Sequence, residues 1–291
     1  MKSNRKVFKD TMLQNSAEQL RDSDWFQSAK QKHDEIVSKI KEKYKNSFSS
    51  QEYHKIEKAN WQFGKECIDN LFQKKNPNSE VAKQLVSAFD NIKHGVKTSQ
   101  KDVKEAATLM AQVIENLPHK PKHPVFTVEE IVGRSFYNIK DNEIHLGTRE
   151  PNYDPNFEIF PTAFHEMAHW LEETPEIKSK IVALYDKITE GLPLPISKKN
   201  VSPGAYVELY RKSKMKLPLE YCTRDYVEEK RRDLISKGKL TQEEINAEIE
   251  KFRKTRPTEL LSVFFEQLLK NPASMLDEYQ DYFEAIMEVL R

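Results

Sequence analysis

Cysteine is scarce in this sequence. Only Cys67 and Cys222 occur among 291 residues, and neither belongs to a CxxC pair or to another spacing typical of metal ligands. A disulfide framework and a zinc site built from cysteines are therefore excluded as the basis of the fold. So little cysteine is typical of a protein from a reducing compartment.

Long apolar runs are also lacking. None approaches the about 18 residues that cross a bilayer, and the opening residues MKSNRKVFKDTMLQ lack the apolar segment of a secretory signal. We therefore expect a cytoplasmic protein with no membrane partner, with signal-less export as the alternative. Charged residues make up 32% of the chain and apolar residues 37%, and the mean hydropathy is -0.77, which together indicate a soluble, helix-rich protein.

No charge of one sign dominates the chain, whose formal net charge is +1. Residues 1–120 carry 22 Lys and Arg against 16 Asp and Glu, a net +6, and residues 121–291 carry a net −5. Opposite signs alternate through the first 120 residues, which favours solvated helix faces over a nucleic-acid patch. We therefore expect no nucleic-acid partner. The opposite hypothesis predicts salt-dependent DNA or RNA binding by residues 1–120.

Hydrophobic periodicity divides the chain into two parts. Apolar residues recur with helical spacing from residue 16 to residue 117. Three prolines then interrupt the pattern between residues 117 and 124, which indicates a boundary. We interpret His119 and His123, which lie in this stretch, as linker residues and not as a metal site. The expected organisation is a helical region at 1–118, a linker at 119–124 and a second domain at 125–291.

The second part begins with short β-favouring runs, which predict strands at 125–128, 131–139 and 143–146. In the last strand Ile144 and Leu146 share one face, so we place His145 on the opposite, solvent-facing side. Further along, helices are predicted before Pro175, from the capping box at Thr241 through residue 252, and at about 257–270 and 275–290. The expected fold class is α+β and mainly α.

Two histidines stand four residues apart in the apolar segment Pro161-Thr-Ala-Phe-His165-Glu166-Met-Ala-His169-Trp-Leu. On a helix this spacing projects both imidazoles from one face, where they can bind the same ion. Glu166 is rotated by about 100° from His165, so it stays out of the ligand set and can accept a proton from water that the ion activates. Such a buried polar cluster needs a partner, and a metal ion supplies one.

A catalytic zinc site takes three protein ligands and leaves a fourth position for water. His169 is the last histidine of the chain, so a third ligand further along must be a carboxylate or, as a weaker alternative, Cys222. We favour Glu259, because the helix predicted around it is apolar on nearly every side, and Glu220 is the competing candidate. Glu266 follows on the same face, and we interpret it as salt-bridged or solvated rather than as a partner of the site.

An oxyanion that forms during hydrolysis is usually stabilised by a Tyr, His or Arg near the metal. No histidine remains downstream for this role. The tyrosines between the two predicted metal-binding helices are interpreted as packing residues: Tyr206, Tyr210, Tyr221 and Tyr226. We therefore assign the role to no residue.

Residues Thr162 to Leu171 resemble the zinc-binding HExxH signature of the zincin metallopeptidases, and a remote glutamate on a later helix is similar to the gluzincin branch. More loosely, residues 125–291 resemble zincin-like modules of phage- and prophage-encoded proteins, through Phe160–Glu172, Glu259-Leu-Leu-Ser and Tyr282-Phe-Glu-Ala-Ile. The resemblance implies a zincin-like domain with a small sheet and an active-site helix, with Glu259 as a ligand. The gap from His169 to Glu259 departs from the shorter spacing of many gluzincins.

The leading hypothesis is a zinc-dependent peptidase in which His165, His169 and Glu259 hold Zn2+ and Glu166 acts as general base. Its substrate would be a protein or peptide, and the N-terminal helices would recruit a protein partner or shield the site. The alternative is a phage or mobile-element structural or interaction protein, whose zinc site stabilises the fold without proteolysis.

Overall fold

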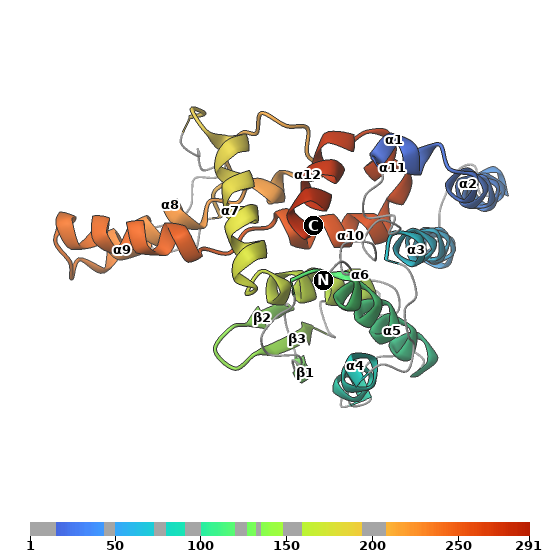
Figure 1. The fold of residues 1–291 in the computed structure, drawn as a ribbon, viewed down its shortest axis with the longest axis horizontal. Helices are drawn as coiled ribbons and strands as arrows, with labels where there is room; N and C mark the ends of the chain where they lie inside the picture. The colour runs from blue at the N-terminus through green and yellow to red at the C-terminus, as the bar shows by residue number, and fades with distance from the viewer. Residues whose placement is uncertain are drawn as a thin grey trace, which may run out of the picture.

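Helices form most of this computed structural model, which describes residues 16–43, 50–72, 80–90, 100–119, 127–131, 135–147, 159–193 and 208–291 (Figure 1). In chain order the helices are α1 (Ala17–Arg21), α2 (Asp24–Lys43), α3 (Ser50–Leu71), α4 (Glu80–Asp90), α5 (Gln100–Asn116), α6 (Ile159–Leu171), α7 (Pro175–Thr189), the short 3-10 helix η2 (Glu220–Thr223), α8 (Tyr226–Lys237), α9 (Gln242–Thr255), α10 (Leu260–Lys270), α11 (Pro272–Asp277) and α12 (Gln280–Leu290).

The small sheet has three strands in the order β1-β3-β2. β1 (Thr127–Ile131) runs parallel to β3 (Glu143–Gly147), and β2 (Phe136–Asn138) pairs antiparallel with β3. The predicted strand 131–139 is thus divided between the end of β1 and β2, while residues 125 and 126 of the first predicted strand lie outside the described residues. The expected α+β, mainly helical class is confirmed.

His145 on β3 is buried, so the prediction that it faces solvent is wrong. It is 8% exposed, its ring stacks on Phe136 with 4.4 Å between centroids, and its Nε2 lies 3.3 Å from Glu143. Phe136 sits directly opposite His145 in the register of β2 and β3. The alternation pattern failed because the aromatic ring of the neighbouring strand covers the face that the pattern left open.

Local sequence signals set several helix ends. Pro161 lies in the first turn of α6, where its missing N–H costs nothing, and Pro175 opens α7. The predicted capping box opens α9: the Glu244 amide donates to Thr241 Oγ1 at 3.3 Å, and the Thr241 amide donates to Glu244 at 2.8 Å. α9 then continues to Thr255, three residues beyond its predicted end.

Two helices near the C-terminus differ from their predicted extents. α10 begins at Leu260 rather than at 257, and the predicted helix 275–290 is divided into α11 and α12. The backbone N–H of Glu278 closes α11 by donating to the Ser274 carbonyl at 2.8 Å. The chain then turns at Tyr279 before α12 begins.

One hydrophobic core joins helices from both parts of the chain. Its large members include Phe63 and Leu71 of α3, Met110 of α5, Phe164 of α6, Phe265 of α10 and Phe283 of α12. α3 and α10 approach closely at Gly64, where an added Cβ would stand 2.6 Å from the Cα of Leu269. Helices on either side of residues 119–124 share this core. The predicted division of the chain into two domains there stays a prediction.

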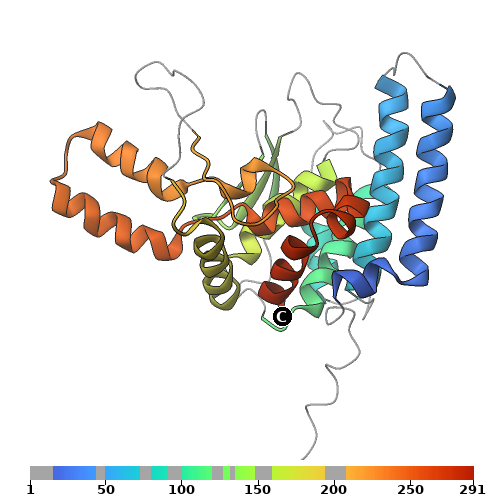
Figure 2. The same ribbon diagram turned by 90° about the horizontal axis from the view of Figure 1, so that it is seen from above.

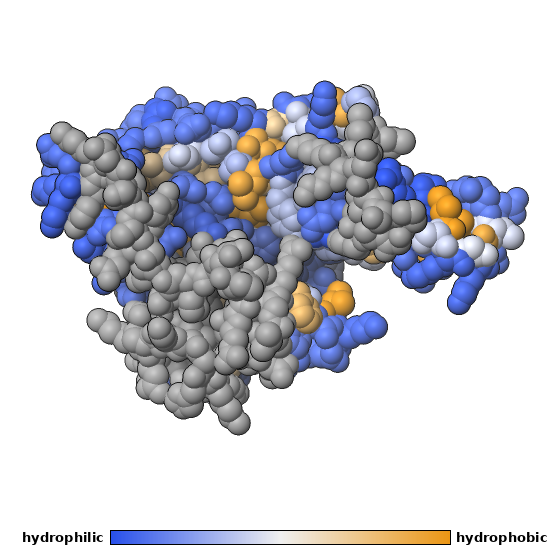
Figure 3. Space-filling model, turned by 180° about the vertical axis from the view of Figure 1, so that it is seen from behind, coloured by the Kyte–Doolittle hydropathy of each residue, from blue (hydrophilic) through white to orange (hydrophobic). Residues whose placement is uncertain are grey.

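Two helical hairpins extend from opposite sides of the core. α2 and α3 lie side by side at one end of the molecule, and α8 and α9 at the other (Figure 1, Figure 2). α8 and α9 enclose a small hydrophobic cluster of their own, formed by Val227, Ile245 and Ile249. Figure 3 shows the α8–α9 hairpin as the projection on the right, mainly hydrophilic with a small hydrophobic spot. Among the described residues, no helix combines the length and the apolar character needed to cross a membrane.

Candidate metal centre

α6 carries both histidines of the HExxH segment on one face. Phe164, Met167 and Ala168 on the other faces are fully buried in the core, so the helix is held firmly in place. The rings of His165 and His169 lie with centroids 5.1 Å apart and planes at 75° to one another. The four-residue spacing therefore brings the two imidazoles together, as the sequence predicted.

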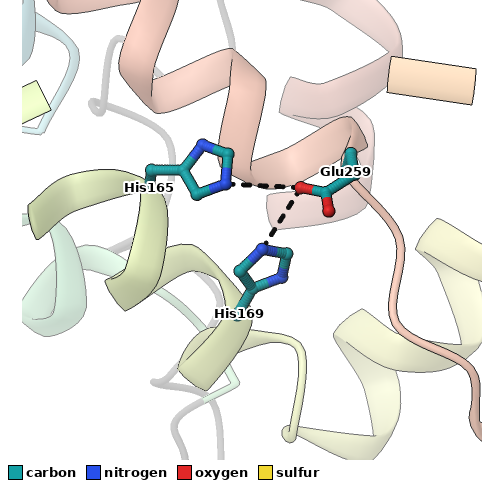
Figure 4. Close-up of side chains that lie close together, drawn as sticks. All are labelled: His165, His169 and Glu259. Atoms are coloured by element: carbon teal, nitrogen blue, oxygen red, sulfur yellow. Dashed lines mark ion pairs between the residues drawn. The ribbon is translucent and has the colours of Figure 1, made fainter. Parts of the chain in front are cut away.

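Glu259 completes the group from the far end of the sequence. Its Oε2 lies 3.3 Å from Nε2 of His165 and 3.2 Å from Nε2 of His169, and its side chain is 1% exposed (Figure 4). The three ligand atoms lie within 4.8 Å of one another. This group of two partly buried histidines and one buried carboxylate can hold a metal ion.

The distances in this group are compatible with donor atoms that share one ion. Charge-assisted N–H···O bonds are about 2.7–2.9 Å long, which is shorter than either distance from Glu259 to a ring nitrogen. A tetrahedral ion with ligand bonds of about 2.0–2.1 Å separates neighbouring donor atoms by about 3.3–3.4 Å. The observed 3.3 and 3.2 Å match that separation.

The electrostatic surroundings favour positive charge between these side chains. Burial alone would lower the pKa of His165, but Glu259 and Glu266 outweigh it and raise that pKa to about 10. The pKa of His169 is also raised, because the charge of Glu259 outweighs the effect of its burial. Burial would raise the pKa of Glu259, yet the two histidines hold it well below its usual range. A bound cation supplies the same positive charge in place of the protons.

The sequence predicted Glu259 inside an apolar helix, and this prediction is wrong. Glu259 is the N-cap residue of α10. Two hydroxyl groups fix its carboxylate. Ser262 Oγ donates to Oε2 at 2.9 Å, and the Tyr226 hydroxyl donates to Oε1. Oε2 is thereby turned toward the histidines. Tyr226, interpreted from the sequence as a packing residue, is in direct contact with the site.

Glu266, about two turns beyond Glu259 on α10, holds the ring of His165. Nδ1 of His165 lies 2.9 Å from Oε2 of Glu266, and Lys270 donates to the other oxygen of Glu266 at 2.9 Å. Glu266 is therefore salt-bridged, as expected, but it is also a partner of the site, which the sequence interpretation rejected. A carboxylate on Nδ1 fixes the tautomer that presents Nε2 to a metal.

Glu166 borders the same cavity as the histidines. This cavity has a volume of about 370 Å³, and Glu166 stands in its wall with 6% exposure. Aromatic side chains line much of the rest: Phe136, Tyr137, Tyr221 and Tyr226. Tyr221 stacks on His165 with 6.2 Å between centroids. The three ligand residues, Glu166 and these aromatic side chains therefore border one space, together with charged side chains that include Lys178 and Arg224.

No protein-family model, curated protein or solved structure matches this chain.

The competing ligand candidates lie elsewhere. Glu220 is exposed, and Cys222 is buried with its Sγ 4.0 Å from the Tyr282 hydroxyl; neither joins the His165 group. Burial raises the pKa of the Cys222 thiol to about 12, which disfavours the thiolate that binds metals. Tyr210 hydrogen-bonds to Glu208. His123 and Tyr206 lie outside the described residues.

Proposed function

We propose that this chain is a zinc-dependent peptidase, with His165, His169 and Glu259 as metal ligands and Glu166 as general base. The observation that carries the proposal is the convergence of two Nε2 atoms and one carboxylate oxygen beside a cavity that Glu166 also borders. Two imidazoles and one carboxylate are a donor set typical of catalytic zinc. Three protein ligands leave a fourth coordination position open.

When bound, zinc would supply Lewis-acid chemistry and lower the pKa of water toward about 7. Glu166 would then accept a proton from the attacking water and deliver it to the leaving amine. Its buried carboxylate stands one residue from His165 and faces the cavity, so it can work beside the ligands. Glu266 would keep His165 in the tautomer whose Nε2 is free to bind.

The cavity lining supports a peptide substrate. Phe136 and Ile139, from β2 and the turn after it, border the cavity and are 44% and 59% exposed. Exposed apolar side chains beside polar catalytic groups suit the side chains and amide groups of a polypeptide. Protein or peptide is therefore the substrate class that this proposal names.

Metal analysis and a Glu166→Gln variant test the proposal. We expect about one zinc per chain, cleavage of an unstructured protein such as casein, and a loss of at least about 100-fold in kcat for the variant with its zinc retained. Glu173→Gln is a matched control, because Glu173 borders the same cavity but is exposed. A metal-free protein, or full cleavage by Glu166→Gln, would contradict the proposal.

The same experiment separates the alternative, a structural or interaction protein of the phage or mobile-element kind. It is favoured by the position of the site, which links α6 to the start of α10 beside the hydrophobic core. This alternative predicts that Glu166→Gln changes nothing, whereas His165→Ala removes the zinc and lowers the melting temperature.

A further inference from the structure

A buried carboxylate outside the ligand set links the two elements that carry the ligands. Glu172 follows directly after α6, three residues beyond His169, and is 1% exposed. Its Oε2 accepts a hydrogen bond from the backbone N–H of Thr258 at 3.1 Å, and its Oε1 accepts one from Thr258 Oγ1 at 2.8 Å. Both oxygens of Glu172 are therefore committed to the residue that precedes Glu259.

The position of Thr258 explains why this link matters. Residues 256–258 lie between α9 and α10 in no helix or strand, so no regular backbone hydrogen bonds fix them. Thr258 is itself 1% exposed, and a buried N–H needs an acceptor. Glu172 supplies that acceptor, and it also accepts a hydrogen bond from the hydroxyl group of Thr258. The backbone is thus fixed one residue before the ligand.

Simple packing does not account for a glutamate at this position. Lys178 lies 3.7 Å from Oε2, which is a loose ion pair, and burial raises the pKa of Glu172 although the charges of Lys178 and His169 and the hydrogen bonds from Thr258 lower it. Burying a carboxylate is costly, and an apolar side chain of similar volume would serve packing equally well. The selective feature of Glu172 is therefore its pair of hydrogen bonds to Thr258.

We propose that Glu172 is a positioning residue that sets where Glu259 stands relative to His165 and His169. α6 carries the two histidines, so a hydrogen-bonded link from its end to Thr258 fixes all three ligands in one frame. Outer partners of this kind tune metal affinity through the ligand that they orient. The inference rests on the metal-binding part of the proposed function and is independent of its peptidase part.

Metal affinity and spectroscopy test this role in the full chain. We expect Glu172→Leu, which removes both acceptors, to raise the dissociation constant for Zn2+ by about 10- to 100-fold. The absorption spectrum of the Co2+-substituted protein should change, since the carboxylate ligand is displaced. Glu173→Gln is the matched control: it removes the neighbouring charge, which also lies 3.7 Å from Lys178, and should leave affinity within about twofold.

Substitutions of Thr258 provide a second route if Glu172→Leu does not fold. Thr258→Val removes one of the two hydrogen bonds and should weaken Zn2+ binding by about threefold to tenfold, whereas Thr258→Ser keeps both donors and should bind as the parent does. The inference is overturned if folded Glu172→Leu or Thr258→Val keeps the parent affinity and Co2+ spectrum, even with a lowered melting temperature. If the variants change Zn2+ affinity and the Co2+ spectrum as expected but the parent protein cleaves no substrate, only the peptidase proposal is contradicted.

Discussion

At the scale of single residues, one buried carboxylate oxygen serves two imidazoles. Glu259 Oε2 faces both Nε2 atoms, while Tyr226 and Ser262 occupy its other hydrogen-bonding positions. Every polar contact of this side chain therefore supports one orientation. A substitution that keeps its shape but removes its charge isolates the electrostatic part of metal binding.

Glu259→Gln should weaken zinc binding by more than the roughly 10- to 100-fold that loss of an outer partner costs, because a neutral amide is a poor zinc ligand. Isothermal titration of the metal-free protein with Zn2+ measures the effect. Glu220→Gln is the control, since Glu220 is the competing carboxylate and is exposed. If Glu259→Gln and the parent bind Zn2+ with equal affinity, Glu259 is not a metal ligand.

The pH dependence of stability should differ between the metal-free and zinc-loaded forms. In the metal-free form the pKa of His165 is raised from 6.5 to about 10, so its contribution is complete below pH 6.5 and is lost as the pH rises toward 10. The pKa of Glu259 is held well below 4.5, so its contribution is complete above pH 4.5 and is lost at lower pH. The metal-free form should therefore be most stable between those limits.

Zinc must displace a proton from His165, so its binding strengthens as the pH rises. The melting temperature of the zinc-loaded protein should exceed that of the chelator-treated protein by a margin that widens from pH 6.5 to pH 9. Differential scanning calorimetry with and without chelator measures this margin. A margin that narrows over the same range would contradict the assignment of His165 as a ligand.

The sequence predicted His165 and His169 from local spacing and Glu259 from the cost of burying its charge. The spacing of His165 and His169 fixes their shared face once α6 forms, and Glu259 follows from the high cost of burying an unpartnered carboxylate. Tyr226 and Glu172 escaped because their contacts join segments 33 and 86 residues apart in the chain. Neither residue has a local pattern that distinguishes it from a packing or surface residue.

At the scale of helices and strands, α3 and α10 cross closely at Gly64. An added Cβ at Gly64 would stand 2.6 Å from Leu269 Cα and 2.8 Å from the carbonyl oxygen of Leu268. Both obstacles are backbone atoms of α10, so no flexible side chain can move aside. One of the two helices must shift instead.

Gly64→Ala should therefore destabilise the protein, although alanine is the better helix former. Overpacking costs about 1–3 kcal/mol, against a gain of about 0.5–1 kcal/mol in helix propensity. Urea unfolding followed by circular dichroism gives the difference. Gln62→Ala, at an exposed position two residues earlier on α3, should be neutral or slightly stabilising. A stabilised Gly64→Ala variant would show that the two helices are not in contact.

Elements were predictable where local chemistry decides. The capping box at Thr241 and Pro175 marked true helix starts. Prediction failed where the local pattern does not determine the structure. His145 on β3 is covered by Phe136 of the neighbouring strand β2. The helix expected at 275–290 is interrupted at Glu278. Apolar periodicity continues through that interruption, so the sequence gives no sign of it.

At the scale of the whole molecule, the N-terminal helices and the metal-bearing helices share one core. Phe72, just after α3, packs against Phe265 of α10 with 6.2 Å between ring centroids, and Gly64 brings the two backbones together. Removing the N-terminal helices would expose that face of α10 to water. The expected division at residues 119–124 can be tested directly on this basis.

A fragment of residues 125–291 should aggregate or unfold without a cooperative transition, since each Å² of exposed apolar surface costs about 25 cal/mol. Size-exclusion chromatography and thermal unfolding, beside the full chain, measure this outcome. A monomeric fragment that unfolds cooperatively and binds one zinc would establish residues 125–291 as an independent domain.

The α8–α9 hairpin has a consequence for how such sites are found in other sequences. α8 starts at Tyr226, which contacts Glu259, and α9 ends at Thr255, four residues before Glu259. The start of α8 and the end of α9 thus both lie near Glu259. If both helices gain or lose the same number of turns, the metal ligands stay where they are. The hairpin, from Tyr226 to Thr255, accounts for part of the 90 residues from His169 to Glu259, so the length of this gap can change with the length of the hairpin. A search pattern for relatives should fix the HExxH spacing and leave the distance to the remote carboxylate free.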